Sequence, residues 1–382
     1  MDMQKRWIIL FVALLSISFL GLFYSGHEGV FTDIDSNLNF ADIAWMITAT
    51  IFVLMMTPGL SFFYGGMVRS KNVISTMLQS FIAMGVISVI WVVVGFSLAF
   101  GEDVGHFIGN PGTFFMFVNV GGATDKLLAP TIPLALYALF QMKFAIITPS
   151  LITGSFAERV RFSGYLVFMI LFCIFVYCPL AHWTWHPDGF LRQMGVLDFA
   201  GGIVVHASSG VAALAGAIFL GRRKESGQPA NIPFVLLGAA MLWLGWFGFN
   251  AGSSLAANSI AVKAFLNTNT ASATAMMTWV VFDCLRGRKP SAMGAAIGAV
   301  VGLVAITPSA GYVTVGESIF IALVVTVICN MAVSWKNKKN SFDDALDVFP
   351  THGVGGIVGT IMTGIFVYNA TENITYWQNL LN

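Results

Sequence analysis

Residues 74–100 read ISTMLQSFIAMGVISVIWVVVGFSLAF and contain no charged side chain. A helix rises about 1.5 Å per residue, so about 20 apolar residues cross the hydrocarbon core of a bilayer. This stretch therefore predicts a transmembrane helix. The same test, applied outward along the chain, predicts ten spans after residue 40: 41–64, 74–100, 131–156, 163–182, 199–220, 232–252, 262–283, 291–306, 315–335 and 349–368.

The composition of the 382 residues agrees with an all-α membrane protein. Hydrophobic residues make up 57% of the chain and charged residues only 10%. A soluble domain carries about 25% charged residues, so most of this surface must face hydrocarbon. The formal net charge is +1, and a chain without a basic excess is not expected to bind nucleic acid.

Basic residues mark every second connection between the predicted spans. Fifteen of the nineteen are Lys5, Arg6, Arg69, Lys71, Arg159, Arg161, Arg222, Arg223, Lys224, Arg286, Arg288, Lys289, Lys336, Lys338 and Lys339. The intervening connections are poor in Lys and Arg, and this alternation is never inverted. The positive-inside rule places the basic loops in the cytoplasm, with residues 27–40 and the C-terminal end on the extracytoplasmic side.

The N-terminal segment leaves two alternatives open. Residues 1–26 have a basic start and an apolar core at 7–24, which is typical both of a signal peptide and of an extra N-terminal span. The bundle is accordingly expected to have ten or eleven spans.

Few ionisable residues lie within or close to the predicted spans, and each costs roughly 2.5–3.5 kcal/mol at membrane depth. They are Lys143, Glu158, Asp198, His206, Asp283 and His352. Glu158 and Asp283 adjoin basic loops and are expected to form ordinary ion pairs at helix ends. The remaining residues are candidates for a functional site.

His206 and His352 occupy corresponding places in two sets of five spans. An aspartate precedes each histidine, Asp198 in one case and Asp347 in the other, and glycines lie beside both. The pattern predicts two five-helix repeats, 41–220 and 232–368. Because each has an odd number of spans, the repeats are inverted, and their shared site lies at their interface near the bilayer midplane. Neutral imidazole can donate and accept, so the pair can relay a proton.

Aromatic residues adjoin polar or small ones at several positions. Phe140 and Phe144 are four residues apart and share a helix face, while Trp185 lies in an outer loop. Tryptophan at a membrane interface is usually an anchor, although its ring face can hold a cation with about 0.5–2 kcal/mol. Spacing alone does not favour the second interpretation.

Five longer motifs follow one another in order. They are Phe140-Gln141-x-x-Phe144-Ala145, Ala157-Glu158-Arg159-x-Arg161-Phe162, Asp198-Phe199-Ala200-Gly201-Gly202-x-Val204-Val205-His206, Gly245-Trp246-Phe247-Gly248-Phe249-Asn250-Ala251-Gly252-Ser253 and Thr351-His352-Gly353-Val354-Gly355-Gly356. Through them the chain resembles the ammonium transporter (Amt) family over residues 41 to 368. The resemblance implies transport of ammonium or ammonia, with methylammonium as an analogue, no cofactor and no enzymatic activity.

The resemblance also implies a recruitment site on the outer side. Trp185, Phe140 and Ser253 would hold the cation with ring faces and a hydroxyl. Asp198 would lie behind this site and stabilise it structurally and electrostatically.

Below the recruitment site the family has a gate and a pore. Phe144 and Phe249 would be the stacked rings of the gate, and His206 and His352 would be the paired histidines inside the pore. Members form homotrimers with one pore per subunit, and many are regulated by a PII-type signal protein at the cytoplasmic face.

Two features depart from the family pattern. Lys143 stands between the two phenylalanines, where a small or polar residue is expected, and its charge would repel ammonium if it faced the pore; an orientation toward a neighbour or outward is favoured. The chain stops at Asn382 in an outer loop, whereas members usually continue through an eleventh span into a cytoplasmic tail.

Two other functions are compatible with parts of this pattern. An ammonium sensor would use the same site and signal through a partner or a fused domain. An intramembrane metalloenzyme would use His206, His352 and Asp198 as ligands, but metal sites usually need three or four closely spaced ligands, so no metal is expected.

Overall fold

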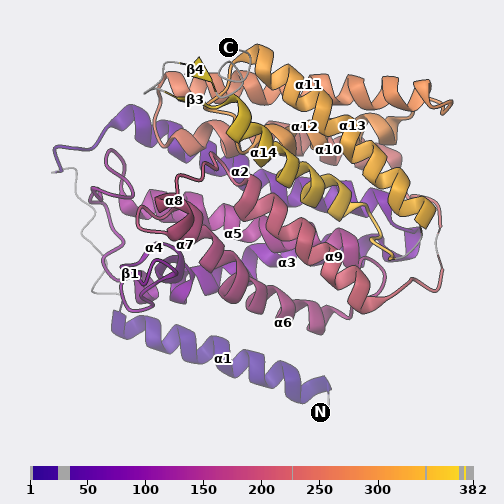
Figure 1. Cartoon of the computed structure of the whole chain (residues 1–382). Coiled ribbons are helices and arrows are strands. Elements are labelled where there is room, and N and C mark those ends of the chain that lie inside the picture. Colours follow the sequence, from indigo (N-terminus) through magenta and orange to yellow (C-terminus); the bar gives the residue numbers. More distant parts are fainter. Residues whose placement is uncertain (1–2, 25–34, 226, 340–341, 370–373, 376–382) are drawn as a thin grey trace.

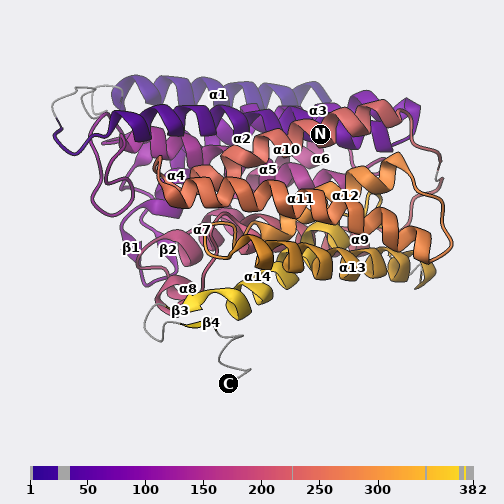
Figure 2. The ribbon, with the colours of Figure 1, turned by 90° about the horizontal axis from the view of Figure 1, so that it is seen from above.

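The computed structural model describes residues 3–24, 35–225, 227–339, 342–369 and 374–375. Long helices run side by side across the view (Figure 1), and the view turned by 90° shows them stacked as one bundle (Figure 2). Much of the segment 27–40 and most of the end 369–382 lie outside the described residues. The expectation that these segments are extracytoplasmic therefore also lies outside the described residues.

Up to residue 220, the described residues form fourteen helical elements and two short strands. They are α1 (Met3–Tyr24), α2 (Phe40–Met67), η2 (Ser70–Asn72), α3 (Val73–Ile90), η3 (Trp91–Gly95), α4 (Phe96–Phe100), β1 (Asp103–Val104), β2 (Ile108–Gly109), η4 (Phe115–Phe117), α5 (Leu134–Phe156), α6 (Phe162–Phe172), η5 (Cys173–Tyr177), α7 (Cys178–Trp185), α8 (Phe190–Gln193), η6 (Gly202–Ala207) and α9 (Ser208–Leu220). Strands β1 and β2 pair antiparallel in the connection between α4 and α5.

The second part continues the bundle from residue 232. Its elements are α10 (Ile232–Ala251), η7 (Gly252–Ser254), α11 (Ser259–Leu285), α12 (Ala292–Ile306), α13 (Val315–Lys339), η8 (Phe349–Val354), α14 (Gly355–Phe366), β3 (Tyr368–Asn369) and β4 (Ile374–Thr375). Strands β3 and β4 also pair antiparallel.

Every predicted span coincides with a helix. Seven helical segments in the described chain are long and apolar enough to cross a membrane, and two shorter apolar helices are Trp7–Phe23 and Ala292–Ile306. The predicted spans 262–283 and 349–368 correspond to α11 and to η8 with α14, which carry more polar residues. The long span 74–100 contains a π-helical turn, η3. In this turn the backbone hydrogen bonds join residues five apart, and not four apart as in an α-helix.

The outward faces of these helices are apolar. Large hydrophobic side chains such as Phe81, Phe175 and Phe219 are more than half exposed. A soluble protein rarely leaves so many large apolar side chains in water, whereas lipid is a favourable surrounding for them. The protein is a multi-pass helical membrane protein.

Two helices form the centre of the bundle. In α5, every residue from Phe140 to Phe156 is buried, and in α12 every residue from Gly298 to Ile306 is buried. These are the third spans of the two predicted repeats. Residues of α5 and α12 therefore lie in the interior of the bundle, away from the surface that faces lipid.

Helix α1 lies on the outside of the bundle (Figure 1). Its ring contact is between Trp7 and Phe162, with centroids 6.5 Å apart, and most of its described side chains are exposed. A single peripheral helix is compatible with a signal peptide and with an additional span, so both alternatives for residues 1–26 stay open.

Candidate functional site

The two predicted histidines meet in the middle of the protein, although 146 positions separate them. Nδ1 of His206 lies 3.3 Å from Nδ1 of His352, and the ring centroids are 5.3 Å apart with the planes inclined at 28°. Both side chains are buried. In a neutral pair one Nδ1 must donate a proton and the other accept it, so the two rings are in opposite tautomers.

Glycines allow this encounter. A Cβ on Gly210 would lie 2.0 Å from the backbone nitrogen of Gly353, and one on Gly356 would lie 2.8 Å from the Cβ of His206. The helices η6–α9 and η8–α14 therefore cross with their backbones in contact, as small residues permit in membranes. Each of these glycines stands four residues after a histidine.

Aromatic rings continue from the histidines toward the outer loops. The ring of Phe249 lies 5.9 Å from that of His206, and the rings of Phe144 and Phe249 lie 4.2 Å apart at 31°. Beyond them, Trp185 meets Phe144 edge-on at 5.8 Å. Ring contacts thus form an unbroken line through the protein, in the order Trp185, Phe144, Phe249, His206 and His352.

Trp246 forms one wall beside the histidines. Its ring lies 5.3 Å from that of His206, and its Nε1 donates to Oγ1 of Thr307 at 2.9 Å. This hydrogen bond satisfies the indole, so the ring is held in one orientation.

Asp198 caps the helix that carries His206. Its carboxylate accepts four backbone N–H groups, from Gly201 (2.8 Å), Gly202 (2.6 Å), Ile203 (2.8 Å) and Val204 (3.2 Å). These are the donors that the first turn of a helix leaves unpaired, and a negative charge is stabilised there. Burial raises the pKa of Asp198, and the four donors oppose this shift.

Asp198 also positions Trp185, whose Nε1 donates to the Asp198 carbonyl at 3.0 Å. One residue therefore ties the outer tryptophan to the start of the histidine helix. Gly201, with a φ of 118°, provides the left-handed backbone that lets the chain turn into this cap.

The other two predicted recruitment residues adjoin the ring pair. Phe140 lies 4.9 Å from Phe144, centroid to centroid, and Ser253 Oγ donates to the carbonyl of Phe249 at 2.8 Å. Ser253 is half-buried, and no hydrogen bond joins it to Trp185 within the described chain.

A small apolar cavity lies on the far side of His352. It is lined by Phe63, Tyr64, Met67, Ile297, Leu346, Val348, Thr351 and His352. The histidine pair thus has the aromatic rings on one side and this cavity on the other.

Comparisons with known proteins decide the family. A sequence model of the Ammonium Transporter Family matches residues 44–380. The chain belongs to the ammonium transporter family. Members are transporters and not enzymes, and in the part of this member that the structure describes no three His, Cys, Asp or Glu residues are grouped to hold a metal ion.

Two named relatives are similar over most of their length. A putative ammonium transporter of Methanothermobacter thermautotrophicus is 47% identical over 335 residues, which are 87% of this chain and 82% of the relative. An ammonium transporter of Aquifex aeolicus is 44% identical over 353 residues, 92% of this chain and 82% of the relative.

Solved structures give the same family. The crystal structure of Saccharomyces cerevisiae Mep2 has a TM-score of 0.84 and 36% identity, covering 91% of this chain and 80% of that chain. A structure described as a sensor Amt protein has a TM-score of 0.80 and 30% identity, covering 88% of this chain and 85% of that chain.

Lys143 remains unusual for this ammonium transporter family member. Its side chain is buried on the central helix α5, so it does not extend to the lipid surface, and the one hydrogen-bond contact of its Nζ is Met142 Sδ at 3.8 Å. Burying an ammonium group without an oxygen acceptor is costly. Of the two expected orientations, the outward one is wrong because the side chain is buried, and an orientation toward a neighbour agrees with this burial.

The sequence interpretation also overlooked a second buried histidine system. His182 Nε2 lies 2.9 Å from Oδ1 of Asp103, and its Nδ1 lies 3.0 Å from the carbonyl of Ala99. This histidine ends the predicted span 163–182, and an ionisable residue there is a signal of the same kind that singled out His206.

Proposed function

We propose that this chain moves ammonium across the membrane as ammonia and a separately relayed proton. Ammonium is held between Trp185 and Phe140, where it gives one proton to solvent water and becomes ammonia. Ammonia then passes the rings of Phe144 and Phe249. The proton follows along His206 and His352.

The observation that carries this proposal is the buried Nδ1–Nδ1 contact of 3.3 Å at the end of an unbroken line of rings. Nε2 of His206 is buried and has no hydrogen-bond partner among the residues that the structure describes. If this nitrogen accepts a proton, Nδ1 of His206 can pass its own to Nδ1 of His352. The opposite tautomers of the pair suit a transfer in one direction.

Selectivity against potassium follows from the same surfaces. Ammonium and potassium have the same charge, but only ammonium can lose a proton. A bare ion entering a dry passage would forfeit hydration worth tens of kcal/mol in a medium of low dielectric constant. Neutral ammonia passes the phenyl rings at far smaller cost.

The proposal is tested by His206→Leu/His352→Leu in liposomes, with ammonium flux and current recorded together. We expect ammonium-induced charge movement to disappear, because leucine cannot carry a proton. His106→Leu, a histidine replacement at an exposed outer position, is the matched control and should keep its current. Unchanged current in the double variant would rule out the relay. Methylammonium should also move and potassium should not.

An ammonium sensor is the second candidate, favoured by the likeness to the sensor Amt protein at a TM-score of 0.80. A sensor would bind ammonium at the same outer site without sustained flux. The liposome assay separates the two functions, because binding without turnover supports the sensor.

We further propose that residues 41–220 and 232–368 are inverted repeats. His206 and His352 lie in π-helical turns, η6 and η8, at the start of the fifth span of each half. A glycine follows each histidine by four residues, and the third span of each half is central. Disulfides engineered between neighbouring positions of the two halves would test this proposal. They should form only if the two halves have opposite orientations.

The basic loops are proposed to face the cytoplasm. Three of them join at one end of the bundle, where Arg69 pairs with Glu158 at 3.0 Å and with Glu225 at 2.6 Å. This agrees with the alternation in the sequence. A PII-type regulator would bind at this end. Labelling of single cysteines introduced at residue 71 in sealed cells tests the orientation.

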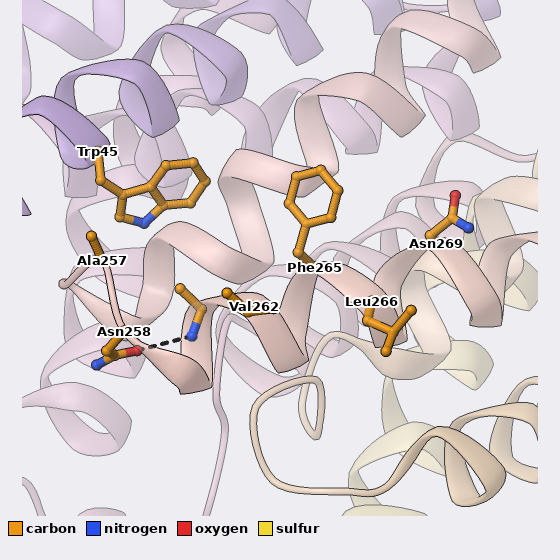
Figure 3. Close-up of a pocket in the computed structure, with 8 residues that line it drawn as sticks. Trp45, Ala257, Asn258, Val262, Phe265, Leu266 and Asn269 are labelled. Carbon is orange, nitrogen blue, oxygen red and sulfur yellow. Dashed lines mark hydrogen bonds between the residues drawn. The ribbon is translucent and has the colours of Figure 1, made fainter.

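A homotrimer is proposed from the family resemblance and from a groove on the flank of α11. Figure 3 shows residues that line this groove, with Trp45 of α2 at one end and Phe265 and Asn269 following along α11. Asn269 is exposed on a helix expected to lie in lipid, and a polar amide is better accommodated against another protein copy. Mass measurement of the detergent-solubilised protein tests the number of copies.

A further inference from the structure

A cavity of about 450 Å³ opens at the end of the bundle that carries the basic loops. It lies among the connections α2–α3, α5–α6 and α9–α10. Its lining residues are Arg69, Lys71, Glu158, Arg159, Leu220, Arg222, Arg223, Lys224 and Glu225. Six of these side chains are basic and two are acidic, so the lining has an excess of positive charge.

The two acids of the lining are already paired. Nε of Arg69 donates to both carboxylate oxygens of Glu158 at 3.0 Å, and its Nη1 donates to Glu225 at 2.6 Å. Lys71 Nζ also reaches Glu225, at 3.3 Å. Arg223 is neutralised from outside the lining, because its guanidinium donates to both oxygens of Asp343 at 2.9 Å.

Arg159 is the exception. Its side chain is only 8% exposed, and its two Nη groups donate to the backbone carbonyls of Gly221, Ser155 and Asp343. The nearest carboxylate oxygen, of Asp343, is 4.0 Å away. Nε of Arg159 is buried without a hydrogen-bond partner. The ion pair with Asp343 is long, and the same Asp343 carboxylate already accepts from Arg223, so the charge of the buried Arg159 guanidinium is only weakly compensated.

Lys224 adds a second unneutralised charge, since no hydrogen bond or ion pair joins it to another part of the described chain. The cavity also adjoins the end of α9, where Ile218 and Phe219 are exposed and Leu220 lines the wall. These apolar side chains place the cavity at the depth of lipid headgroups.

We propose that this cavity is a binding site for a phosphate group, held by Arg159, Lys71 and Lys224. Guanidinium and ammonium groups donate charge-assisted hydrogen bonds to phosphate oxygens, and arginine matches their geometry. The phosphate belongs either to an anionic lipid or to a free anion. This site is separate from the transport path and does not depend on the proposed function.

The test uses the full chain in phosphatidylcholine nanodiscs, titrated calorimetrically with inorganic phosphate against chloride of equal ionic strength. We expect saturable phosphate binding and a raised unfolding temperature. Lys71→Gln/Lys224→Gln should weaken the affinity about ten-fold or more. Lys289→Gln/Lys339→Gln removes two exposed charges elsewhere at the same end and should bind as the parent does. Arg159→Lys keeps the charge but loses the fork, and should also bind more weakly.

Nanodiscs with an equimolar mixture of phosphatidylglycerol and phosphatidylcholine distinguish the two sources. If the lipid headgroup is the ligand, the mixture stabilises the parent but not the Lys71→Gln/Lys224→Gln variant, and free phosphate no longer binds. If a free anion is the ligand, phosphate binds equally in both lipids. The proposal is overturned if neither phosphate nor phosphatidylglycerol affects the parent more than that variant. Because the lysines are on the surface, this outcome cannot be blamed on misfolding.

Discussion

The segments Asp198–His206 and Asp344–His352 each place an aspartate eight residues before a buried histidine, but the two aspartates are bonded differently. Both oxygens of Asp198 are filled by four backbone N–H groups. In Asp344, Oδ2 accepts the N–H of Phe349 at 2.7 Å, while Oδ1 is buried without a partner. The sequence pattern suggested Asp347 as the second aspartate, yet Asp344 has the matching spacing.

The surroundings of the two aspartates differ as well. Asp198 is joined to the outer tryptophan, whereas Asp344 lies in an ionic cluster in which Lys336 Nζ contacts the Asp344 carbonyl at 2.7 Å and Asp347 at 2.6 Å. Burial, with the charge of Asp347, raises the pKa of Asp344 to about 6. The carboxylate of Asp198 therefore fixes the segment before His206, whereas the segment before His352 contains an acid that can change its charge.

Asp198→Ala should have the largest effect, because it leaves four N–H groups without their acceptor. At about 1–3 kcal/mol for each buried unpaired group, the free energy of unfolding should fall by roughly 4 kcal/mol or more. Flux should fall about 100-fold, since Trp185 and the histidine helix lose their common anchor. Thermal unfolding and liposome flux measure the two effects. Asp198→Asn retains one acceptor oxygen and should be intermediate; a fully active, stable alanine variant would contradict the anchoring role.

Asp344→Asn should change the pH dependence of stability. The folded-state pKa of about 6 exceeds the ordinary value of 3.8, so the folded state binds more protons between these values. The stability from the protonated acid is complete below about pH 4 and is lost as the pH rises through 6, by up to about 3 kcal/mol. Unfolding temperatures between pH 4 and 7 should fall less in the variant than in the parent. If the unfolding temperatures of the parent and the variant depend equally on pH, Asp344 does not differ from Asp198 in its ability to change charge.

Gly210→Ala and Gly356→Ala test whether the two halves cross symmetrically. Each new Cβ would meet backbone or side-chain atoms of the other helix at 2.0 and 2.7 Å respectively. Overpacking of this kind costs about 1–3 kcal/mol, and both variants should unfold at lower temperature than the parent. Gly164→Ala is the matched control, because no atom lies within 4 Å of its Cβ. If only one of the two variants has a lower unfolding temperature than the parent, the two halves do not contribute equally to the crossing.

Lys143→Met should have the smallest effect and the opposite sign. Methionine fills a similar volume without an ammonium group that lacks an oxygen acceptor, so the free energy of unfolding should rise by roughly 1 kcal/mol. Chemical unfolding in detergent measures this change. A lower stability would mean that Lys143 has a partner outside this chain, and Lys143→Gln would then show whether the charge is needed.

The sequence by itself determined the membrane class, the ten spans after residue 40 and the two candidate histidines. Long apolar runs, broken only by a few ionisable residues, can be identified from hydropathy, because lipid leaves no other surface for them. The aromatic and glycine motifs around Phe144, His206 and His352 were sufficient to indicate the family.

Only the tertiary structure decided how these residues meet. The 3.3 Å contact between His206 and His352 depends on backbones that touch at glycines far apart in the chain. The unequal bonding of Asp198 and Asp344 and the burial of Lys143 likewise depend on which neighbours fill the space. Hydropathy records whether a side chain prefers lipid or water, and it contains no information about the partner that a buried polar atom finds.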